Sequence, residues 1–289
     1  MRIVYLPAQM LIFIALAPLV SGIIAKIKNN LRFRRGPGIF QPYFNLAKYF
    51  MKDEALSEHT SWIFRAAPYI VFAATASAAL LLSFPFAGDF IALIFLLSLG
   101  RFFLALAGLD AASAFGGMGS SREMFIASFV EPVVLLSILG VSLSAGTTNL
   151  SVVCGARAMT ISTFLAALAL FLVTLAETSR VPVDNQETHL ELTMVHEAML
   201  LESSGRSLAL LELSAYLKQL LFFSILAGLV FTGLSVSPLF FLAKILLIAL
   251  TVALVELSLA KMRLFRVIDF LAFGGVLAVL SIVAVVLGV

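Results

Sequence analysis

Long apolar runs, separated by shorter polar segments, dominate this chain. Eight of the runs reach the length of about 20 residues that an α-helix needs to cross the hydrocarbon core of a bilayer. They cover residues 4–25, 66–86, 90–109, 124–146, 159–178, 208–233, 238–258 and 267–288. The pattern predicts an all-α, polytopic membrane protein, with about eight transmembrane helices in a single integral membrane domain over residues 1–289.

The composition agrees with a membrane protein and excludes several other classes. Of the 289 residues, 62% are hydrophobic and only 12% are charged, whereas about 25% of the residues of a soluble domain are charged. The net charge of +3 is small and its basic residues are dispersed, so no nucleic-acid partner is expected. The single cysteine, Cys154, excludes an internal disulfide and an iron–sulfur cluster held by this chain alone. The first apolar run has no small-residue cleavage site, so no cleavable signal peptide is expected.

The basic residues alternate between the two sides of the predicted bundle. Segments 26–65, 110–123, 179–207 and 259–266 carry 8, 1, 2 and 3 of the 19 Lys and Arg residues. The segments on the opposite side carry only Arg2 and Arg157. By the positive-inside rule, both termini are expected outside, and the chain is expected to cross the inner (cytoplasmic) membrane of the cell several times.

The segment from Leu175 to Glu202, LAETSRVPVDNQETHLELTMVHEAMLLE, follows directly on an apolar run yet is rich in titratable groups. These are Glu177, Arg180, Asp184, Glu187, His189, Glu191, His196, Glu197 and Glu202. Ionisable groups at the mouth of a membrane bundle are costly, and function is the usual reason that they persist. The histidines suit either hydrogen bonding at a protein interface or proton relay. A metal site is a weaker interpretation, because the spacing is not that of two histidines one helical turn apart.

Local geometry gives two further expectations for this loop. If residues 187–202 are helical, Glu187, Glu191 and Glu202 share one side and the two histidines the other. Glu177 and Arg180 are three residues apart, a spacing that favours an ion pair at the end of a helix.

Charged side chains also interrupt the predicted spans or stand at their ends. They are Arg101, Asp110, Glu123, Glu131, Lys218, Lys244 and Glu256. Each costs about 2.5–3.5 kcal/mol at the centre of a bilayer unless it is paired or hydrated. Static ion pairing and snorkelling explain individual cases. For the whole set, the sequence favours a polar axis through the membrane that includes Glu123, Glu131 and Glu256.

The first basic loop, over residues 26–65, mixes aromatic and cationic residues in RFRRGPGIFQPYFNLAKYFMKDE. Its glycines and prolines end any helix near residues 36–38, whereas residues 43–51 form an amphipathic stretch suited to the membrane surface. The loop is therefore either an interfacial anchor or a docking surface for a cytoplasmic partner. The docking candidates are Arg32, Arg34, Arg35, Gly36, Pro37 and Gln41.

These motifs resemble a known family. RRGPGIFQP, LAETSRVPVD and the acidic loop are similar to the membrane subunit of respiratory complex I that lies beneath the quinone chamber. HLELTMVHEAMLLE and AKMRLFRVIDF are closer to its relatives in the energy-converting group 4 NiFe hydrogenases, the formate hydrogenlyase and Ech-type complexes. The departures from the complex I pattern, among them His189, His196 and Glu256, argue against quinone binding.

The resemblance implies a membrane anchor and coupling subunit of a hydrogenase complex, which links redox chemistry in a cytoplasmic arm to proton or sodium translocation. The chain itself would hold no redox centre, metal or other cofactor. A NiFe centre and iron–sulfur clusters would lie in its partners: the hydrogenase large and small subunits and iron–sulfur subunits. Antiporter-like membrane subunits would be its neighbours in the bilayer, and loops 26–65 and 179–207 would dock the arm.

The resemblance also assigns a coupling or proton path. At matching positions this path contains Glu123, Glu131, Glu177, Arg180, Asp184, Glu187, Glu191 and Glu202. His196 and Glu256 are added from their own chemistry, as a histidine that titrates near neutral pH and as a charge within a span. The alternative function is the quinone-site membrane subunit of a complex I-type NADH or ferredoxin:quinone oxidoreductase. A stand-alone secondary transporter is a third hypothesis, which the lack of a convincing internal repeat disfavours.

Overall fold

The computed structural model describes residues 5–83, 89–149, 153, 160–185, 194–231 and 238–288. It confirms the prediction of a polytopic all-α membrane protein. Among these described residues, seven helices are long and apolar enough to cross a membrane: α1 (Tyr5–Leu31), α3 (Trp62–Ser83), α4 (Phe90–Asp110), α5 (Ala114–Ala145), α9 (Gly205–Val230), α10 (Pro238–Ser258) and α11 (Leu264–Leu287). The 17-residue α7 (Ile161–Glu177) corresponds to the remaining predicted span, and α2 (Gln41–Phe50) and α8 (His196–Leu200) are short.

Two boundaries differ from the predictions. The helix expected over residues 124–146 begins at Ala114, so Glu123 lies inside α5 and not in a loop before it. Ser113 starts this helix, because its side chain accepts a hydrogen bond from the backbone N–H of Gly116 and so satisfies one otherwise unpaired donor. In the acidic loop, the described helix is limited to α8, and Glu202 lies in a turn after it. Glu187, His189 and Glu191 lie outside the described residues.

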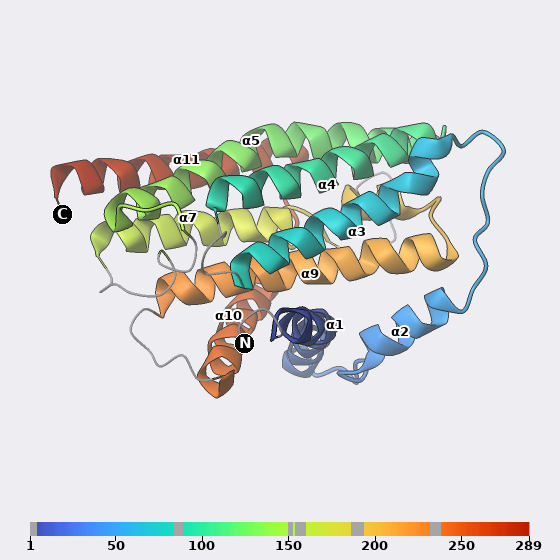
Figure 1. The fold of residues 1–289 in the computed structure, drawn as a ribbon, viewed down its shortest axis with the longest axis horizontal. Coiled ribbons are helices and arrows are strands. Elements are labelled where there is room, and N and C mark those ends of the chain that lie inside the picture. The colour runs from blue at the N-terminus through green and yellow to red at the C-terminus, as the bar shows by residue number, and fades with distance from the viewer. Residues whose placement is uncertain are drawn as a thin grey trace.

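Four of the long helices and the shorter α7 surround a common interior. Helix α3 packs against α4 and α9, α4 against α5, α5 against α7, and α7 against α9, which closes the ring. Helix α11 lies against α5 and α7, and these helices run along the long axis of the molecule (Figure 1). The short α8 fills one end of the ring and contacts α5 and α4. This arrangement turns one face of each ring helix inward.

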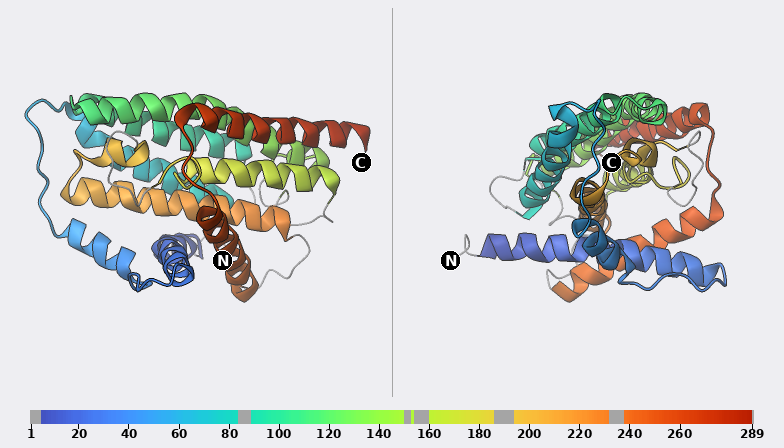
Figure 2. Two further views of the ribbon diagram at one scale, coloured as in Figure 1. Left: turned by 180° about the vertical axis from the view of Figure 1, so that it is seen from behind. Right: turned by 90° about the vertical axis from the view of Figure 1, so that its right-hand side faces the viewer.

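Helix α9 is the centre of the molecule. Leu217, Leu220, Leu221, Phe222 and Phe223 are almost completely buried, because α3 and α7 cover one side of α9 while α1 and α10 cover the other. Helix α1 runs across the bundle and is seen end-on in Figure 1 and lengthwise in the right-hand view of Figure 2. Consecutive residues of α9 therefore face two separate helix groups.

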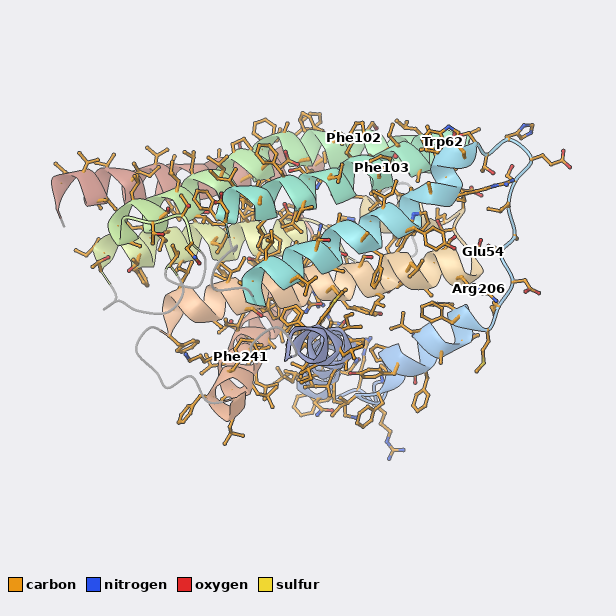
Figure 3. The ribbon with its side chains drawn as sticks, in the orientation of Figure 1. Glu54, Trp62, Phe102, Phe103, Arg206 and Phe241 are labelled. Atoms are coloured by element: carbon orange, nitrogen blue, oxygen red, sulfur yellow. The ribbon has the colours of Figure 1, made fainter. Side chains whose placement is uncertain are left out.

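The connection from α2 to α3 holds the start of α9. The Glu54 carboxylate accepts hydrogen bonds from the backbone N–H of Ser207, at 2.9 Å, and from its hydroxyl, at 3.0 Å. Gly205 has φ +54°, and a Cβ there would lie 2.7 Å from the carbonyl oxygen of Asp53, so only glycine fits without strain. Glu54 and Arg206 lie together at this end of the molecule (Figure 3).

Candidate functional site

The interior of the five-helix ring contains a group of charged side chains, which we call the first charge network: Arg101, Glu123, Glu131, Glu177 and Lys218. Arg101 from α4 lies at its centre. Its guanidinium contacts Glu177 at the end of α7, and lies 3.4 Å from Glu123 and 3.2 Å from Glu131, both on α5. Lys218 of α9 completes the network, because its Nζ lies 3.1 Å from the second oxygen of Glu177.

Burial differs sharply across this network. The Glu177 side chain is only 4% exposed, and two cations share its carboxylate. The Glu131 side chain is 40% exposed, although it lies within a membrane-spanning helix. A carboxylate in that position needs a polar neighbour, since contact with lipid is costly. The network therefore runs from a sealed interior to an open side of α5.

A second charge network lies on the other side of α9 and consists of Lys28, Arg180, Gln219 and Glu256. Glu256 of α10 is buried and accepts from Arg180 at 3.0 Å, while Lys28 of α1 lies 2.6 Å from its other oxygen. Arg180 also donates to the side-chain oxygen of Gln219 at 3.0 Å. Because Lys218 and Gln219 are adjacent on α9, this helix carries one member of each network.

These pairings correct one prediction. The spacing predicted that Glu177 and Arg180 would pair with each other, and this was wrong. Glu177 binds Arg101 and Lys218, whereas Arg180 binds Glu256 and Gln219. Helix α7 ends at Glu177, so the turn that follows directs Arg180 towards α10 and away from the helix face of Glu177.

Asp184 connects the turn after α7 to α8 and to the segment before α11. Its carboxylate accepts from the backbone N–H groups of Val195, at 3.1 Å, and His196, at 3.2 Å, at the start of α8. Lys261 donates to its other oxygen at 2.7 Å. A carboxylate at the N-terminal end of a helix satisfies free donors and complements the local positive potential. Asp184 thus positions α8.

Helix α8 directs two titratable side chains to different places. His196 lines a cavity of about 30 Å³ together with Arg101, Glu123 and Lys218, a volume that accommodates about two water molecules. Burial lowers the pKa of His196, and the charges of Lys218 and Arg101 act in the same direction against those of Glu123 and Asp184. Neutral imidazole both donates and accepts a hydrogen bond, so His196 suits hydrogen bonding with water in this cavity, and its role in a proton path stays a prediction.

Glu197, the next residue, belongs to a separate acidic pair. Burial raises the pKa of Glu197 to about 7, and the negative charges of Glu212 and Asp184 add to the effect. Glu212 lies on α9 and forms a side-chain hydrogen bond with Tyr216. The carboxyl group of Glu197 therefore changes charge near neutral pH.

A polar cavity adjoins the second charge network. It has a volume of about 140 Å³ and is lined by Ser21, Lys28, Arg180, Asp184 and Glu256, among others. The Nε atom of Arg180 and the Nε2 atom of Gln219 have no hydrogen-bond partner among the described residues. Polar surroundings of this size suit several ordered water molecules.

The remaining predicted residues lie apart from both networks. Glu202 is exposed, whereas Glu187 and Glu191 fall outside the described residues. The docking candidates lie between α1 and the first residue of α2, Gln41. Every one of them except the half-buried Gly36 is exposed: Arg32, Arg34, Arg35, Gly36, Pro37 and Gln41. The site and docking roles of these residues stay predictions.

Several members of the site were not predicted as site residues. Arg101 and Lys218 are recognisable in the sequence as charges within spans, but nothing along the chain shows that both bind Glu177. Lys28 and Lys261 appear in the sequence only as topological charges, and Gln219 carries no signal. Within the described part of the chain, no group of three His, Cys, Asp or Glu side chains is arranged to hold a metal ion.

Comparison with known proteins places these features in context. The model of the family described as NADH dehydrogenase matches residues 4–289. Hydrogenase-4 component C of Escherichia coli (strain K12) is 34% identical over 304 residues, which cover 96% of this chain and 94% of that protein. Formate hydrogenlyase subunit 4 of the same organism is 32% identical over 286 residues, covering 91% and 92%.

The fold is also similar to that of a chain in the structure of the membrane-bound sulfane sulfur reductase, an archaeal respiratory membrane complex. The TM-score is 0.81 at 18% sequence identity, and the match covers 97% of this chain and 98% of that chain. At this identity the likeness concerns the fold alone.

Proposed function

The chain belongs to the NADH dehydrogenase family, and from this membership we propose that it is the membrane anchor and coupling subunit of a hydrogenase complex. Two relatives that match over more than nine tenths of its length are, by name, subunits of a hydrogenase and of a formate hydrogenlyase. On this proposal the chain links redox chemistry in a cytoplasmic arm to proton or sodium translocation in the inner membrane.

The observation that carries the proposal is the contact of one guanidinium with three carboxylates. Arg101 contacts the sealed Glu177, the intermediate Glu123 and the partly exposed Glu131. Protonation of Glu177 would remove one negative charge, so Arg101 would interact more strongly with the other two acids. A change of charge near the arm would thereby lower the proton affinity of Glu131, without an ion crossing this chain.

The open side of Glu131 supports a membrane neighbour. An ionisable side chain that is 40% exposed within a membrane-spanning helix needs a polar partner in the bilayer, and we propose that an antiporter-like subunit supplies it. This neighbour would respond to the charge of Glu131, because two sites are coupled when each changes the other's preferred state.

At the opposite end, the basic loop and the acidic loop are proposed to dock the arm. The exposed residues Arg32, Arg34 and Arg35 lie on the segment that joins α1 to α2, and the positive-inside rule favours a cytoplasmic position for this segment. The arm would contribute the hydrogenase large and small subunits and the iron–sulfur subunits, with the NiFe centre and the clusters in those chains.

The quinone-site alternative would require an apolar tunnel beside Glu177–Asp184. The cavity that the described residues form beside Arg180 and Asp184 has a volume of about 140 Å³ and is bordered by Lys28 and Glu256. These charged walls suit water better than an isoprenoid tail. The geometry therefore favours the coupling role over the quinone site.

The test is transport by the purified complex in vesicles. A tag on this chain should recover nickel–iron and iron–sulfur subunits, and the vesicles should couple hydrogen turnover to an ion gradient. In Glu131→Gln, hydrogen turnover should persist while ions moved per hydrogen fall by about tenfold, because the coupling between the two sites is lost.

Asp89→Asn is the matched control. Asp89 accepts from the backbone N–H of Ile91 at the start of α4, and asparagine caps helices equally well, so transport should be unchanged. Full coupling in Glu131→Gln would refute the proposed path. Recovery of a quinone-reactive complex without nickel would instead support the alternative function.

A further inference from the structure

A groove opens on the membrane-facing side of the bundle between α7, α9 and α10. Its volume is about 320 Å³, and Thr251 is the only polar residue among those that line it: Phe164, Ala167, Leu168, Phe171, Leu226, Val230, Phe231, Leu247, Ile248, Thr251 and Val255. The groove exists because α10 packs on α1 and α9 and diverges from α7, as Figure 1 shows. The volume lies at the lower end of the range of about 300–1,000 Å³ for ligand sites.

The walls of the groove are apolar, and the hydroxyl of Thr251 already has a hydrogen-bond partner. The Thr251 hydroxyl donates to the carbonyl of Ile248 within its own helix, at 2.7 Å. At the rim, Phe164 and Leu247 are 52% and 49% exposed, so a ligand can enter from the surrounding bilayer. An alkyl chain fits these surroundings, because it requires no hydrogen bonds.

A cation stands one helical turn from this groove. Lys244 precedes Leu247 and Ile248 on α10, and its Nζ donates to the carbonyl of Phe231, another lining residue, at 3.0 Å. Since Phe231 follows the last residue of α9, Lys244 lies level with the end of that helix. Lysine can cap a helix C-terminus in this way, but its ammonium has three donors. No carboxylate among the described residues pairs with it.

We propose that this groove binds one phospholipid, with an acyl chain between α7, α9 and α10 and the phosphate on Lys244. The apolar walls and the cation at one end match the two parts of that molecule. A neighbouring transmembrane helix is about 10 Å wide with its side chains. A groove of this volume is better suited to a single acyl chain than to such a helix. The bound lipid would hold α10 at its oblique angle to α7.

Photocrosslinking in the purified complex tests the occupant. Benzoylphenylalanine at position 164 would report on the groove, and at position 102 on the outer surface of α4. Phe102 is 49% exposed, similar to Phe164, and lies away from the groove (Figure 3). After extensive detergent washing, irradiation should give a phospholipid adduct at position 164 and none at position 102.

The other possible results of the crosslinking would contradict the proposal. An adduct between position 164 and a peptide of another subunit would show that a protein helix fills the groove and would overturn the proposal. Lipid adducts at both positions would show only ordinary annular lipid, and lipid adducts at neither would show that the groove retains no lipid. Either result would overturn the proposal as well.

Substitutions provide an independent test by native mass spectrometry of retained lipid. Thr251→Phe fills the groove and should release the phospholipid, whereas Leu250→Phe, on an exposed part of the same helix that does not line the groove, should retain it. Lys244→Gln should weaken retention by about tenfold, the loss of one charge-assisted hydrogen bond. Retention of the lipid by the folded Thr251→Phe complex would contradict the assignment.

Discussion

The carboxylate of Glu177 holds two cations inside the bundle, and this makes it the most sensitive residue of the first charge network. In Glu177→Gln, Arg101 and Lys218 lose the negative charge that they share. Removal of one partner from a buried ion pair costs about 3–5 kcal/mol. We therefore expect a clear fall in the thermal unfolding midpoint of the purified subunit, measured by intrinsic fluorescence in detergent.

Glu131→Gln is the matched comparison, because it removes a carboxylate from the same guanidinium. The Glu131 side chain is 40% exposed, and exposed pairs contribute about 1 kcal/mol or less. Its midpoint should lie close to that of the unmodified protein. Equal losses in the two variants would contradict the difference in burial on which the coupling path is based.

Glu197 gives a prediction about pH. Burial, with the charges of Glu212 and Asp184, raises the pKa of Glu197 from 4.5 to about 7 in the folded state. The folded state then binds this proton more tightly than the unfolded state, so the contribution to stability is complete below pH 4.5 and is lost as the pH rises through 7.

The unfolding midpoint should accordingly decline between pH 5.5 and pH 8.5, and Glu197→Gln should reduce that decline. Glu202→Gln is the control, because Glu202 is exposed and its replacement should leave the decline unchanged. An identical pH profile for Glu197→Gln and the unmodified protein would rule out Glu197 as the titrating group.

At the residue scale, the sequence identifies the chemistry but not the partners. Charges within apolar runs are recognisable in the sequence because each is costly in lipid. Glu123, Glu131 and Glu177 do lie together, around the guanidinium of Arg101. The Glu177–Arg180 pair was predicted from spacing along one helix and is wrong, because three-dimensional packing offers Arg180 a partner on α10. Spacing along the sequence indicates which side chains are neighbours within one helix, whereas buried charges here pair with side chains of other helices.

At the scale of elements, the position of α8 depends on a glycine, Gly119 of α5, which has no side chain. A Cβ at Gly119 on α5 would lie 2.9 Å from the Cβ of Ala198 and 3.0 Å from the carbonyl oxygen of Val195. Gly119→Ala should therefore push α8 away from α5 and withdraw His196 from Arg101 and Glu123. Overpacking costs about 1–3 kcal/mol, so backbone hydrogen exchange across residues 196–200 should accelerate by about tenfold.

Gly117→Ala separates this contact from helix propensity. No atom lies within 4 Å of a Cβ built at Gly117, and alanine is favoured over glycine within a helix by about 0.5–1 kcal/mol. This control should leave exchange in α8 unchanged and stabilise α5 slightly. Equal exchange rates in the two variants would mean that α8 does not depend on the close approach.

The long elements could be predicted from the sequence because apolar character accumulates over about 20 residues. The start of α5 could not, since residues 114–123 contain glycine, serine, arginine and glutamate and read as a polar connection. The Ser113 cap and the contacts of α8 with α5 stabilise that first part as helix. Hydropathy detects the part of a helix that faces lipid, and it misses the part of the same helix that packs against other protein segments.

At the scale of the whole molecule, the decisive feature is that two charge networks share one helix. The sequence does not reveal this, because the ring order of α3, α4, α5, α7 and α9 arises from contacts between distant segments. The first network contains three carboxylates and two cations, whereas the second contains two cations and one carboxylate. When all groups are ionised, the first network is net negative and the second is net positive. This opposite sign favours electrostatic coupling between the two networks across α9.

A double-mutant cycle tests whether α9 transmits between them. Glu177 binds Lys218, and Glu256 reaches Gln219 through Arg180. Independent sites add within about 0.3–0.5 kcal/mol, and coupled ones deviate by about 0.5–3 kcal/mol. The free energies of unfolding of Glu177→Gln and Glu256→Gln should therefore fail to add in the double variant. Their deviation should exceed 0.5 kcal/mol, because each substitution changes the field that acts on consecutive side chains of one rigid helix.

The control cycle pairs Glu177→Gln with Asp110→Asn. Asp110 accepts from the backbone N–H groups of Ser61 and Phe64 at the start of α3, so it stabilises a helix end without joining either network. This pair should be additive. If the Glu177 and Glu256 substitutions were equally additive, the two networks would be separate structural ion pairs, and the coupling path would be confined to the route from Glu177 through Arg101 to Glu131.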